Sequence, residues 1–462
     1  MGVIRLLLAT WVAKLTRFLV RLLRLGGGSS LPGLLALWID PDYIQGLASK
    51  LARAVLVTGT NGKTTTSSLL TAILRREGQR VAHNTGGSNL LRGVATALAA
   101  DASLLGKVRA RVGVFEVDEA TMPEAVAALT PKVIVVSNLF RDQLDRYGEI
   151  DKTAAILRSA LTQAPQAQVV LCADDPLVCS LGEGRRQVHY FGIEEPGRQS
   201  DELRRATDAP DCPRCGTALE YEANYYGGLG IWRCPEGDLT RPKPAVQSGP
   251  VSLRGLSGST LTLDISGEKA ELSLPLPGLY NVHNALAAAA TASLLGIAPP
   301  AIRAALEEGV SLFGRIEQLD VEGRRVAIVL IKNPAGANQA LELLRTEPGQ
   351  KHLLLALNDN FADGTDISWI WDTDYERVPP EVSRIWASGQ RAPELTLRLK
   401  YAGVKSDLLR EEGRLIRAFR AALRELPAET PLFILPTYTA LLDLHAHLRR
   451  RGASRAFWRE GE

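Results

Sequence analysis

This sequence of 462 residues has few cysteines, few aromatic residues and little net charge. Five cysteines in a chain of this length do not make a disulfide scaffold, and they are typical of a protein from a reducing, cytoplasmic compartment. A net charge of +3, without a stripe of basic and aromatic residues, argues against nucleic-acid binding. Hydrophobic residues make up 45% of the chain, which is ordinary for a globular protein of two or three domains.

The sequence also lacks an uncharged apolar run of the roughly 20 residues that a membrane-spanning helix needs. Residues 3–25 are strongly apolar, but basic residues interrupt them, and they lack the clean features of a signal peptide. Helical spacing places Lys14, Arg17, Arg21 and Arg24 on one face and large apolar side chains mostly on the other. Two interpretations are open. Residues 1–25 form either a contact to the inner face of the cell membrane or a helix that packs on the protein itself.

The most informative segment that is present lies at residues 55–66. An apolar strand-like run ends in a Gly-rich turn, which leads directly into a helical pattern. Such a turn directs backbone N–H groups and a helix N-terminus at a phosphate. Lys63 would reach the β- and γ-phosphates, and the Thr64 hydroxyl would bind Mg²⁺. The predicted nucleotide-binding residues here are Gly59, Thr60, Asn61, Gly62, Lys63, Thr64 and Thr65.

Polar residues follow two further strand-like runs. Residues 114–120 end a strand in three carboxylates, which can supply a ligand to Mg²⁺. Residues 137–149 follow the next strand and contain Asn138 and Asp142 as polar candidates. Because ligands of α/β proteins bind at the carboxyl edge of the sheet, we expect these residues to lie near the phosphate loop.

Alternating strands and helices over residues 50–200 predict a parallel α/β sheet. Residues 201–248 interrupt this rhythm, residues 259–265 alternate like an antiparallel strand, and a helix is expected over 281–296. A second α/β set begins after about residue 313. The predicted strands of the first set are 55–58, 111–116, 132–137, 168–173 and 188–192. Those of the second set are 326–331, 352–357, 384–387 and 431–435.

Three cysteines cluster within the interruption. Cys212 and Cys215 form a C-x₂-C pair, and Cys234 follows after 18 residues. Two such pairs at this separation would indicate a zinc ribbon, but Gly237 stands where the fourth cysteine belongs. Zinc binding through Cys212, Cys215 and Cys234 therefore stays open, with the fourth ligand unknown.

The phosphate loop resembles that of the Mur ligases, the ATP-dependent amide-bond ligases of peptidoglycan synthesis. Residues 137–149, 331–338, 357–372 and 435–442 narrow the resemblance to MurT-type proteins, over about residues 30–445. The resemblance implies an α/β fold with three parts: an N-terminal helix and linker (1–43), a central ATP-binding domain (44–312) with an inserted cysteine ribbon (201–248), and a C-terminal α/β domain (313–462).

Within this resemblance, Glu116 matches the glutamate that binds Mg²⁺, and Asn284 matches the residue that contacts adenine. Arg315 matches the Gly-Arg segment at the domain junction, where it would reach the γ-phosphate. Gln143 replaces a metal-binding histidine of many Mur ligases. The resemblance further implies that an aspartate of residues 357–372 completes a Cys–His pair in a partner glutaminase. We assign this role to Asp366, with Asp359 and Asp363 as alternatives.

MurT-type proteins are subunits of lipid II isoglutaminyl synthase. The resemblance thus implies ATP-dependent amidation of D-glutamate in the lipid II stem peptide, with Lys63, Glu116 and Asp366 as the catalytic residues. ATP and Mg²⁺ are expected, and ammonia would come from a GatD-type glutamine amidotransferase in a heterodimer. Two alternatives remain: a self-sufficient ligase that adds an amino acid, and a nucleotide-binding scaffold without catalysis.

Overall fold

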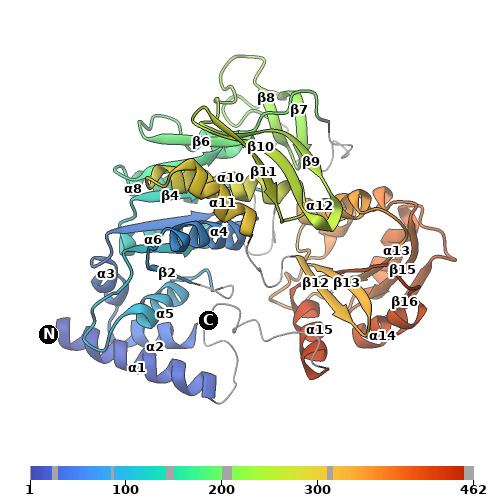
Figure 1. The fold of residues 1–462 in the computed structure, drawn as a ribbon, viewed down its shortest axis with the longest axis horizontal. Helices are drawn as coiled ribbons and strands as arrows, with labels where there is room; N and C mark the ends of the chain where they lie inside the picture. Colours follow the sequence, from blue (N-terminus) through green and yellow to red (C-terminus); the bar gives the residue numbers. More distant parts are fainter. Residues whose placement is uncertain are drawn as a thin grey trace.

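The computed structural model describes residues 2–22, 30–84, 88–141, 150–199, 211–309 and 316–451. Within these residues the chain forms two large sheets covered by helices and one small two-stranded sheet. In Figure 1 the first large sheet, with its helices, occupies the left and centre, and the second lies on the right. This arrangement confirms the α/β class predicted from the alternating pattern.

The first sheet has the strand order β11-β10-β9-β6-β5-β4-β1-β3-β2. Its strands from β2 to β9 pair in parallel, and β10 and β11 add an antiparallel edge. Its strands are β1 (Arg53–Thr58), β2 (Val81–His83), β3 (Val112–Glu116), β4 (Val133–Val136), β5 (Gln168–Cys172), β6 (Val188–Ile193), β9 (Val246–Leu253), β10 (Ser259–Ile265) and β11 (Glu268–Leu274). Central strands such as β4 are continuous apolar runs because helices cover both faces of a parallel sheet.

The helices that accompany this sheet include α4 and α10, which pack against each other. Residues 281–292 of α10 are all buried, so this helix is buried on every side and crosses the interior. The helices of this part are α4 (Lys63–Arg76), α5 (Leu91–Asp101), α6 (Met122–Leu129), α8 (Ile150–Gln163), α9 (Pro176–Ser180), α10 (Leu279–Leu294) and α11 (Pro299–Glu308).

Three helices precede the first strand: α1 (Gly2–Leu22), α2 (Leu31–Ile39) and α3 (Tyr43–Ala48). The side of α1 that faces the protein carries small residues, and Ala9 and Ala13 are fully buried there. The interpretation of this segment as a helix that packs on the protein is therefore confirmed for this side of α1, and the contact with a membrane stays a prediction. In the part of the chain that the structure describes, no helix has the length and apolarity needed to cross a membrane.

The cysteine-containing segment forms a small antiparallel ribbon of β7 (Glu220–Tyr226) and β8 (Leu229–Arg233). Figure 1 shows this ribbon at the top of the molecule, beside β9 and β10. Trp232 anchors the ribbon, because its buried indole Nε1 donates to the carbonyl of Ala173 at 3.1 Å.

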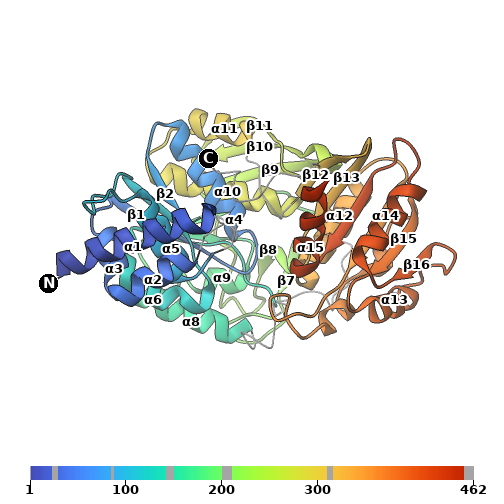
Figure 2. The same cartoon turned by 90° about the horizontal axis from the view of Figure 1, so that it is seen from below.

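The second sheet has the order β12-β13-β17-β14-β15-β16, with only the β12–β13 pair antiparallel. Figure 2, seen from below, has its helices α12, α14 and α15 around the strands. Its elements are β12 (Ile316–Val321), β13 (Arg324–Val329), α12 (Pro334–Thr346), β14 (Lys351–Ala356), β15 (Val382–Ser388), α13 (Ala392–Tyr401), β16 (Leu409–Glu412), α14 (Leu415–Glu425), β17 (Leu432–Pro436) and α15 (Tyr438–Arg450). The predicted strands thus form, with ends shifted by two residues or less.

Candidate active site

The carboxyl ends of β1, β3 and β4 form one edge of the first sheet and carry the predicted phosphate and metal residues. β1 lies between β3 and β4, and Glu116 at the end of β3 is the register partner of Val57 in β1. The chain moves to one side of β1 for β2 and β3 and to the other side for β4, so the edge contains a topological switch point. Ligands of open α/β sheets bind at such a point.

Two glycines let the loop after β1 approach its neighbours. Gly59 has φ of 125°, and a Cβ atom there would lie 2.3 Å from Ser137 Oγ. Gly62 has φ of 87°, and a Cβ atom would lie 1.9 Å from Asn284 Oδ1. Both positions need the left-handed conformation and the missing side chain of glycine. Lys63 then begins α4, so the helix N-terminus faces this edge of the sheet.

The end of β4 supports the same loop from the other side. Asn138 accepts from the backbone N–H of Asn61 through Oδ1 at 2.9 Å and donates from Nδ2 to the Asn61 carbonyl at 3.1 Å. Its own carbonyl accepts from Thr60 N at 2.9 Å, and Ser137 Oγ donates to the Asn61 carbonyl at 2.9 Å. Asn138 therefore fixes the backbone of the loop, in addition to its predicted role at the nucleotide.

Thr64 and Glu116 lie in direct contact, since Thr64 Oγ1 donates to Glu116 Oε2 at 2.8 Å. Asn84 fixes Glu116 by donating to its carbonyl at 2.8 Å and accepting from its N–H at 2.9 Å. A hydroxyl and a carboxylate oxygen beside a phosphate loop form the donor set that Mg²⁺ prefers. The two residues predicted to bind Mg²⁺ therefore fit that ion in chemistry and in placement.

Lys63 is buried and forms an ion pair with Glu119, whose carboxylate lies 3.1 Å from its Nζ. Nζ also donates to the carbonyl of Gly59 at 2.6 Å. Burial is the largest single influence and would raise the pKa of Glu119. The charges of Lys63 and Lys332, with hydrogen bonds from Lys63 and the backbone, together outweigh it, so that the pKa is lowered and the carboxylate is ionised. Lys63 is thus held at the loop by a fixed negative charge.

A cleft separates the loop from the start of α12 in the second sheet. Lys332 Nζ donates to the Thr60 carbonyl at 3.2 Å, and Asn333 exchanges side-chain hydrogen bonds with Asn61 at 3.3 and 3.4 Å. The cleft is lined by residues from both sides of this contact: Asn61, Gly62, Thr65, Asn138, Phe140, Tyr226, Tyr280, Asn284, Val329, Leu330, Lys332, Ala335, Gly336 and Gln339. Of the predicted nucleotide residues, Asn61, Gly62, Thr65, Asn138 and Asn284 therefore meet in one place.

His283 precedes Asn284 and belongs to a buried hydrogen-bonded network. Its Nε2 lies 2.7 Å from Asp174 Oδ2, and its Nδ1 lies 3.1 Å from the Tyr226 hydroxyl. Arg241 forms an ion pair with the other oxygen of Asp174 at 2.8 Å. The Cys172 thiol lies close to Asp174 and His283. Both ring nitrogens of His283 have partners within the protein, so the residue packs the interior and connects α10 to the ribbon.

The buried cysteines Cys172 and Cys179 are not suited to nucleophilic catalysis. Burial raises the pKa of both the Cys172 and Cys179 thiols, so they stay protonated. Cys172 is therefore a small buried residue of the core.

The thiols of Cys212, Cys215 and Cys234 converge within 4.8 Å of one another. Two turns carry these cysteines, one beginning at Cys212 and the other at Cys234. In the first turn, Gly216 N donates to the carbonyl of Cys212, four residues before it. In the second turn, Gly237 N donates to the carbonyl of Cys234, only three residues before it. Gly237 has φ of 77°, which a cysteine would adopt only with strain. The second turn is therefore one residue tighter, and Gly237 is not a simple replacement of a ligand. Three thiols fit zinc, but the usual fourth protein ligand is lacking among the described residues.

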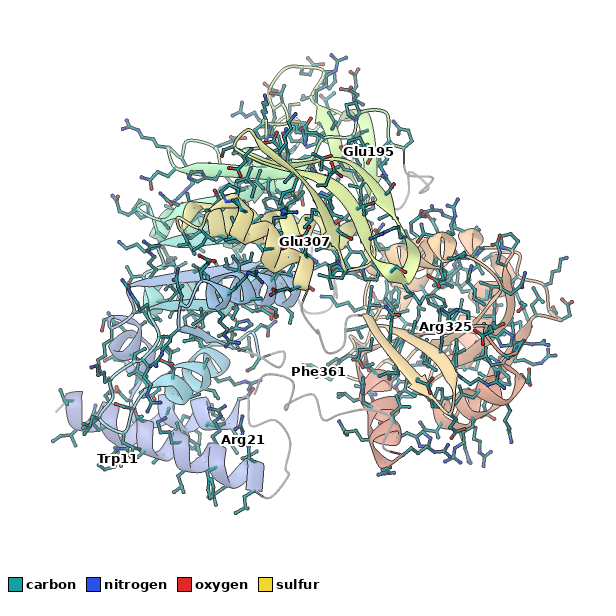
Figure 3. The ribbon with its side chains drawn as sticks, viewed as in Figure 1. Trp11, Arg21, Glu195, Glu307, Arg325 and Phe361 are labelled. Carbon is teal, nitrogen blue, oxygen red and sulfur yellow. The ribbon has the colours of Figure 1, made fainter. Side chains whose placement is uncertain are left out.

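The three candidate aspartates of residues 357–372 have different surroundings. Asp359 pairs with Arg391 at 2.5 Å, and buried Asp363 accepts from the backbone and hydroxyl of Thr439 at 2.7 and 2.6 Å. Asp366 is exposed, and one of its oxygens accepts from Ser368 N at 2.8 Å. Of the three, Asp366 offers the most accessible carboxylate. Phe361, near it in sequence, also projects from this half of the molecule in Figure 3.

Asp142, Gln143 and Arg315 lie outside the described residues. The sequence analysis did not single out Glu119, Lys332 or Asn333. Glu119 was detectable as the third carboxylate of the acidic strand end, whereas Lys332 and Asn333 approach the loop only through the packing of the second sheet.

Comparison with known proteins agrees with this geometry. The family descriptions "Mur ligase middle domain" and "MurT ligase C-terminal" match residues 57–211 and 330–441. The lipid II isoglutaminyl synthase (glutamine-hydrolyzing) subunit MurT of Streptococcus pneumoniae is 36% identical over 430 residues, covering 93% of this chain and 94% of that protein. The subunit MurT of Staphylococcus aureus is 31% identical over 92% of this chain and 93% of its own length.

Solved structures share the fold at lower identity. A pseudomurein peptide ligase type C from Methanothermus fervidus has a TM-score of 0.66 and 22% identity, covering 86% of this chain and 79% of that one. MurF from Acinetobacter baumannii has a TM-score of 0.65 and 17% identity, covering 90% and 80%. The chain therefore belongs to the MurT family, within the ATP-dependent Mur ligases.

Proposed function

We propose that this chain amidates the α-carboxyl group of D-glutamate in the lipid II stem peptide, forming D-isoglutamine through an acyl phosphate. The relatives named as MurT subunits of lipid II isoglutaminyl synthase support this reaction. The observation that carries the proposal is the Thr64–Glu116 contact beside Lys63, in the same loop whose Gly62 and Thr65 line the cleft.

In the first step, a carboxylate oxygen of the substrate attacks the γ-phosphorus of ATP, and ADP leaves. The loop amides at the start of α4 and the Lys63 ammonium would hold the phosphates, and Asn284 would contact the adenine. Thr64 and Glu116 would hold Mg²⁺, which offsets the charge on the transferring phosphoryl group. Arg315, which matches the Gly-Arg segment of the family, is proposed to reach the γ-phosphate.

In the second step, the ammonia nitrogen attacks the carbonyl carbon of the acyl phosphate, and phosphate leaves as the nitrogen loses a proton. The acyl phosphate must be protected from water. The contacts of Lys332 and Asn333 with the loop are where the second sheet would close over the nucleotide.

Ammonia is proposed to come from a GatD-type glutaminase bound as a partner. Asp366 would orient the histidine of a Cys–His pair in that partner, as the third member of a triad. Its exposure and the internal pairing of Asp359 and Asp363 support this choice.

The test is ATP-dependent amidation of lipid II by this chain, with and without the co-purified glutaminase, supplied with glutamine or with ammonium. We expect turnover with ammonium alone, and with glutamine only when the partner is present. Ligation of an amino acid without a partner would favour the self-sufficient ligase, and ATP binding without any turnover would favour the scaffold.

The partner role of Asp366 is tested by Asp366→Asn, which keeps an oxygen to accept from Ser368 N. We expect loss of the glutamine-driven reaction by about 10³-fold or more, as for removal of a triad carboxylate, with the ammonium-driven reaction unchanged. Asp372→Asn, an equal charge change at a nearby exposed aspartate, is the matched control. Equal loss of both reactions would contradict the assignment.

A further inference from the structure

The outward face of α1 is apolar, which is unusual for a surface helix. The side chains of Ile4, Leu8, Trp11, Leu15, Phe18 and Leu22 are all exposed. At about 100° per residue they fall within an arc of roughly 80°. Small residues such as Ala9 and Ala13 face the protein, so these six large apolar side chains point to solvent. Figure 3 shows Trp11 on the side of α1 away from the rest of the molecule.

Basic residues flank this stripe. The segment Gly2–Leu22 contains Arg5, Lys14, Arg17 and Arg21 and no acidic residue. Helical spacing places Arg5 on one side of the stripe and the other three on the opposite side. Apolar side chains between basic flanks are the pattern of a helix that lies in the interface of an anionic bilayer.

The loop after α5 extends the same surface. Trp11 Nε1 donates to the carbonyl of Leu104 at 2.8 Å, and this contact places the loop tip beside α1. At this tip the apolar side chains of Leu104 and Leu105 are exposed to solvent, at 62% and 83%. Lys107 and Arg109 follow and are also exposed. A second element, distant in sequence, thus repeats the combination of exposed leucine and positive charge.

The helix α2, which packs against α1, adds further exposed apolar groups, and its Trp38 is 79% exposed. Its first turn is connected to the candidate active site. Ser30 Oγ lies 2.9 Å from Ser88 Oγ, and Asn84 donates to the Ser88 carbonyl while it holds the backbone of Glu116. The helices at this surface are therefore joined to the Mg²⁺ residues through a short chain of hydrogen bonds.

We propose that α1, together with the loop tip at Leu104 and Leu105, docks on the surface of an anionic lipid bilayer. The occupant is a membrane rather than a protein partner because the positive charges flank the apolar stripe and no acidic residue interrupts α1. Trp11 matches the interfacial position that tryptophan prefers. The further consequence, that docking brings the active site to a lipid-linked substrate, rests on the proposed function, but the docking itself does not.

The experiment measures flotation of the full chain with vesicles of equal parts phosphatidylglycerol and phosphatidylcholine, and with vesicles of phosphatidylcholine alone, without nucleotide or lipid II. We expect binding to the anionic vesicles, weakened by added salt. The variant Leu15→Glu/Phe18→Glu changes two exposed side chains and should bind about tenfold less or weaker still. Leu397→Glu, at an exposed leucine of α13, is the control and should bind like the wild type.

Circular dichroism and thermal melting verify that both variants are folded. Quenching of tryptophan fluorescence by brominated lipid should fall in Trp11→Phe, because Trp11 would lie at the lipid interface. Unchanged binding of Leu15→Glu/Phe18→Glu, or no binding by the wild type, overturns the proposal. The proposal is also overturned if light scattering shows that the wild type is a dimer and that Leu15→Glu/Phe18→Glu is a monomer. In that case a second copy of the chain would cover the apolar face of α1. Failure of amidation with intact vesicle binding would count against the proposed function alone.

Discussion

At the scale of single residues, the site depends on a few short contacts between charged and polar groups. Glu116 is fixed by Asn84 on its backbone and meets Thr64 with its side chain, whereas Glu119 neutralises Lys63. The two acidic residues of one strand end therefore have different tasks. One faces the predicted metal, and the other holds the phosphate-binding lysine.

We expect Glu116→Gln to lower ammonium-driven amidation by about 10²-fold or more, since it removes a charge that would hold Mg²⁺. The Mg²⁺ concentration needed for half-maximal rate should rise as well. Glu124→Gln, the same change at an exposed residue in the first turn of α6, is the control. A variant with full rate at the wild-type Mg²⁺ requirement would contradict the role of Glu116.

His83 makes the stability of the fold depend on pH. Burial, with a smaller contribution from Arg75, lowers its pKa to about 4, and Nε2 lies 3.1 Å from Ser67 Oγ. In the unfolded chain the imidazole would protonate near 6.5, so the folded state loses stability as the pH falls from about 6.5 towards 4. The loss is at most about 3 kcal/mol. Urea unfolding across this range should show a smaller loss for His83→Gln than for the wild type; equal losses would refute the assignment.

At the scale of elements, the small ribbon shows how local geometry limits what a motif can do. Its two turns have similar sequences, but the second closes one residue earlier and places Gly237 in the left-handed region. The ribbon is held to the end of β5 by Trp232 and to α10 by Tyr226. Its position in the fold therefore does not depend on a metal alone.

We expect the ribbon to bind one Zn²⁺ through the thiolates of Cys212, Cys215 and Cys234, and to lose it readily to a chelator because the protein ligand set is incomplete. Cys234→Ser should abolish binding in a dye-competition titration. Gly237→Cys should not tighten it, since cysteine is strained at this φ. Absence of zinc from the wild type, or much tighter binding by Gly237→Cys, would show that the interpretation is wrong.

At the scale of the whole molecule, the candidate site is completed only where the two sheets meet. Asn333 has two functions at this contact: it caps α12 by accepting from Gly336 N at 2.8 Å, and it exchanges hydrogen bonds with Asn61. The first function stabilises α12, and the second connects the second sheet to the phosphate loop.

Two substitutions separate these functions. Asn333→Ser keeps a good cap and loses the reach to Asn61, so it should lower kcat/KM for ATP about tenfold with little change in stability. Asn333→Ala should show the same kinetic loss and unfold with about 1 kcal/mol less stability. Steady-state kinetics and urea unfolding measure both effects. Wild-type kinetics for the Ser variant would mean that the contact with Asn61 does not contribute.

The sequence by itself determined the α/β class, the central strands of both large sheets and the phosphate loop, because these depend on local patterns of apolar residues and glycine. It also indicated that Thr64 and Glu116 lie together, since both lie at the carboxyl ends of strands of one parallel sheet. Tertiary structure alone decided that Lys63 pairs with Glu119, that Lys332 and Asn333 approach the loop, and that the large side chains of α1 face outward. Each of these features depends on how elements distant in sequence pack against one another. Sequence periodicity shows that a helix has two different faces, but it does not show which face the rest of the protein covers.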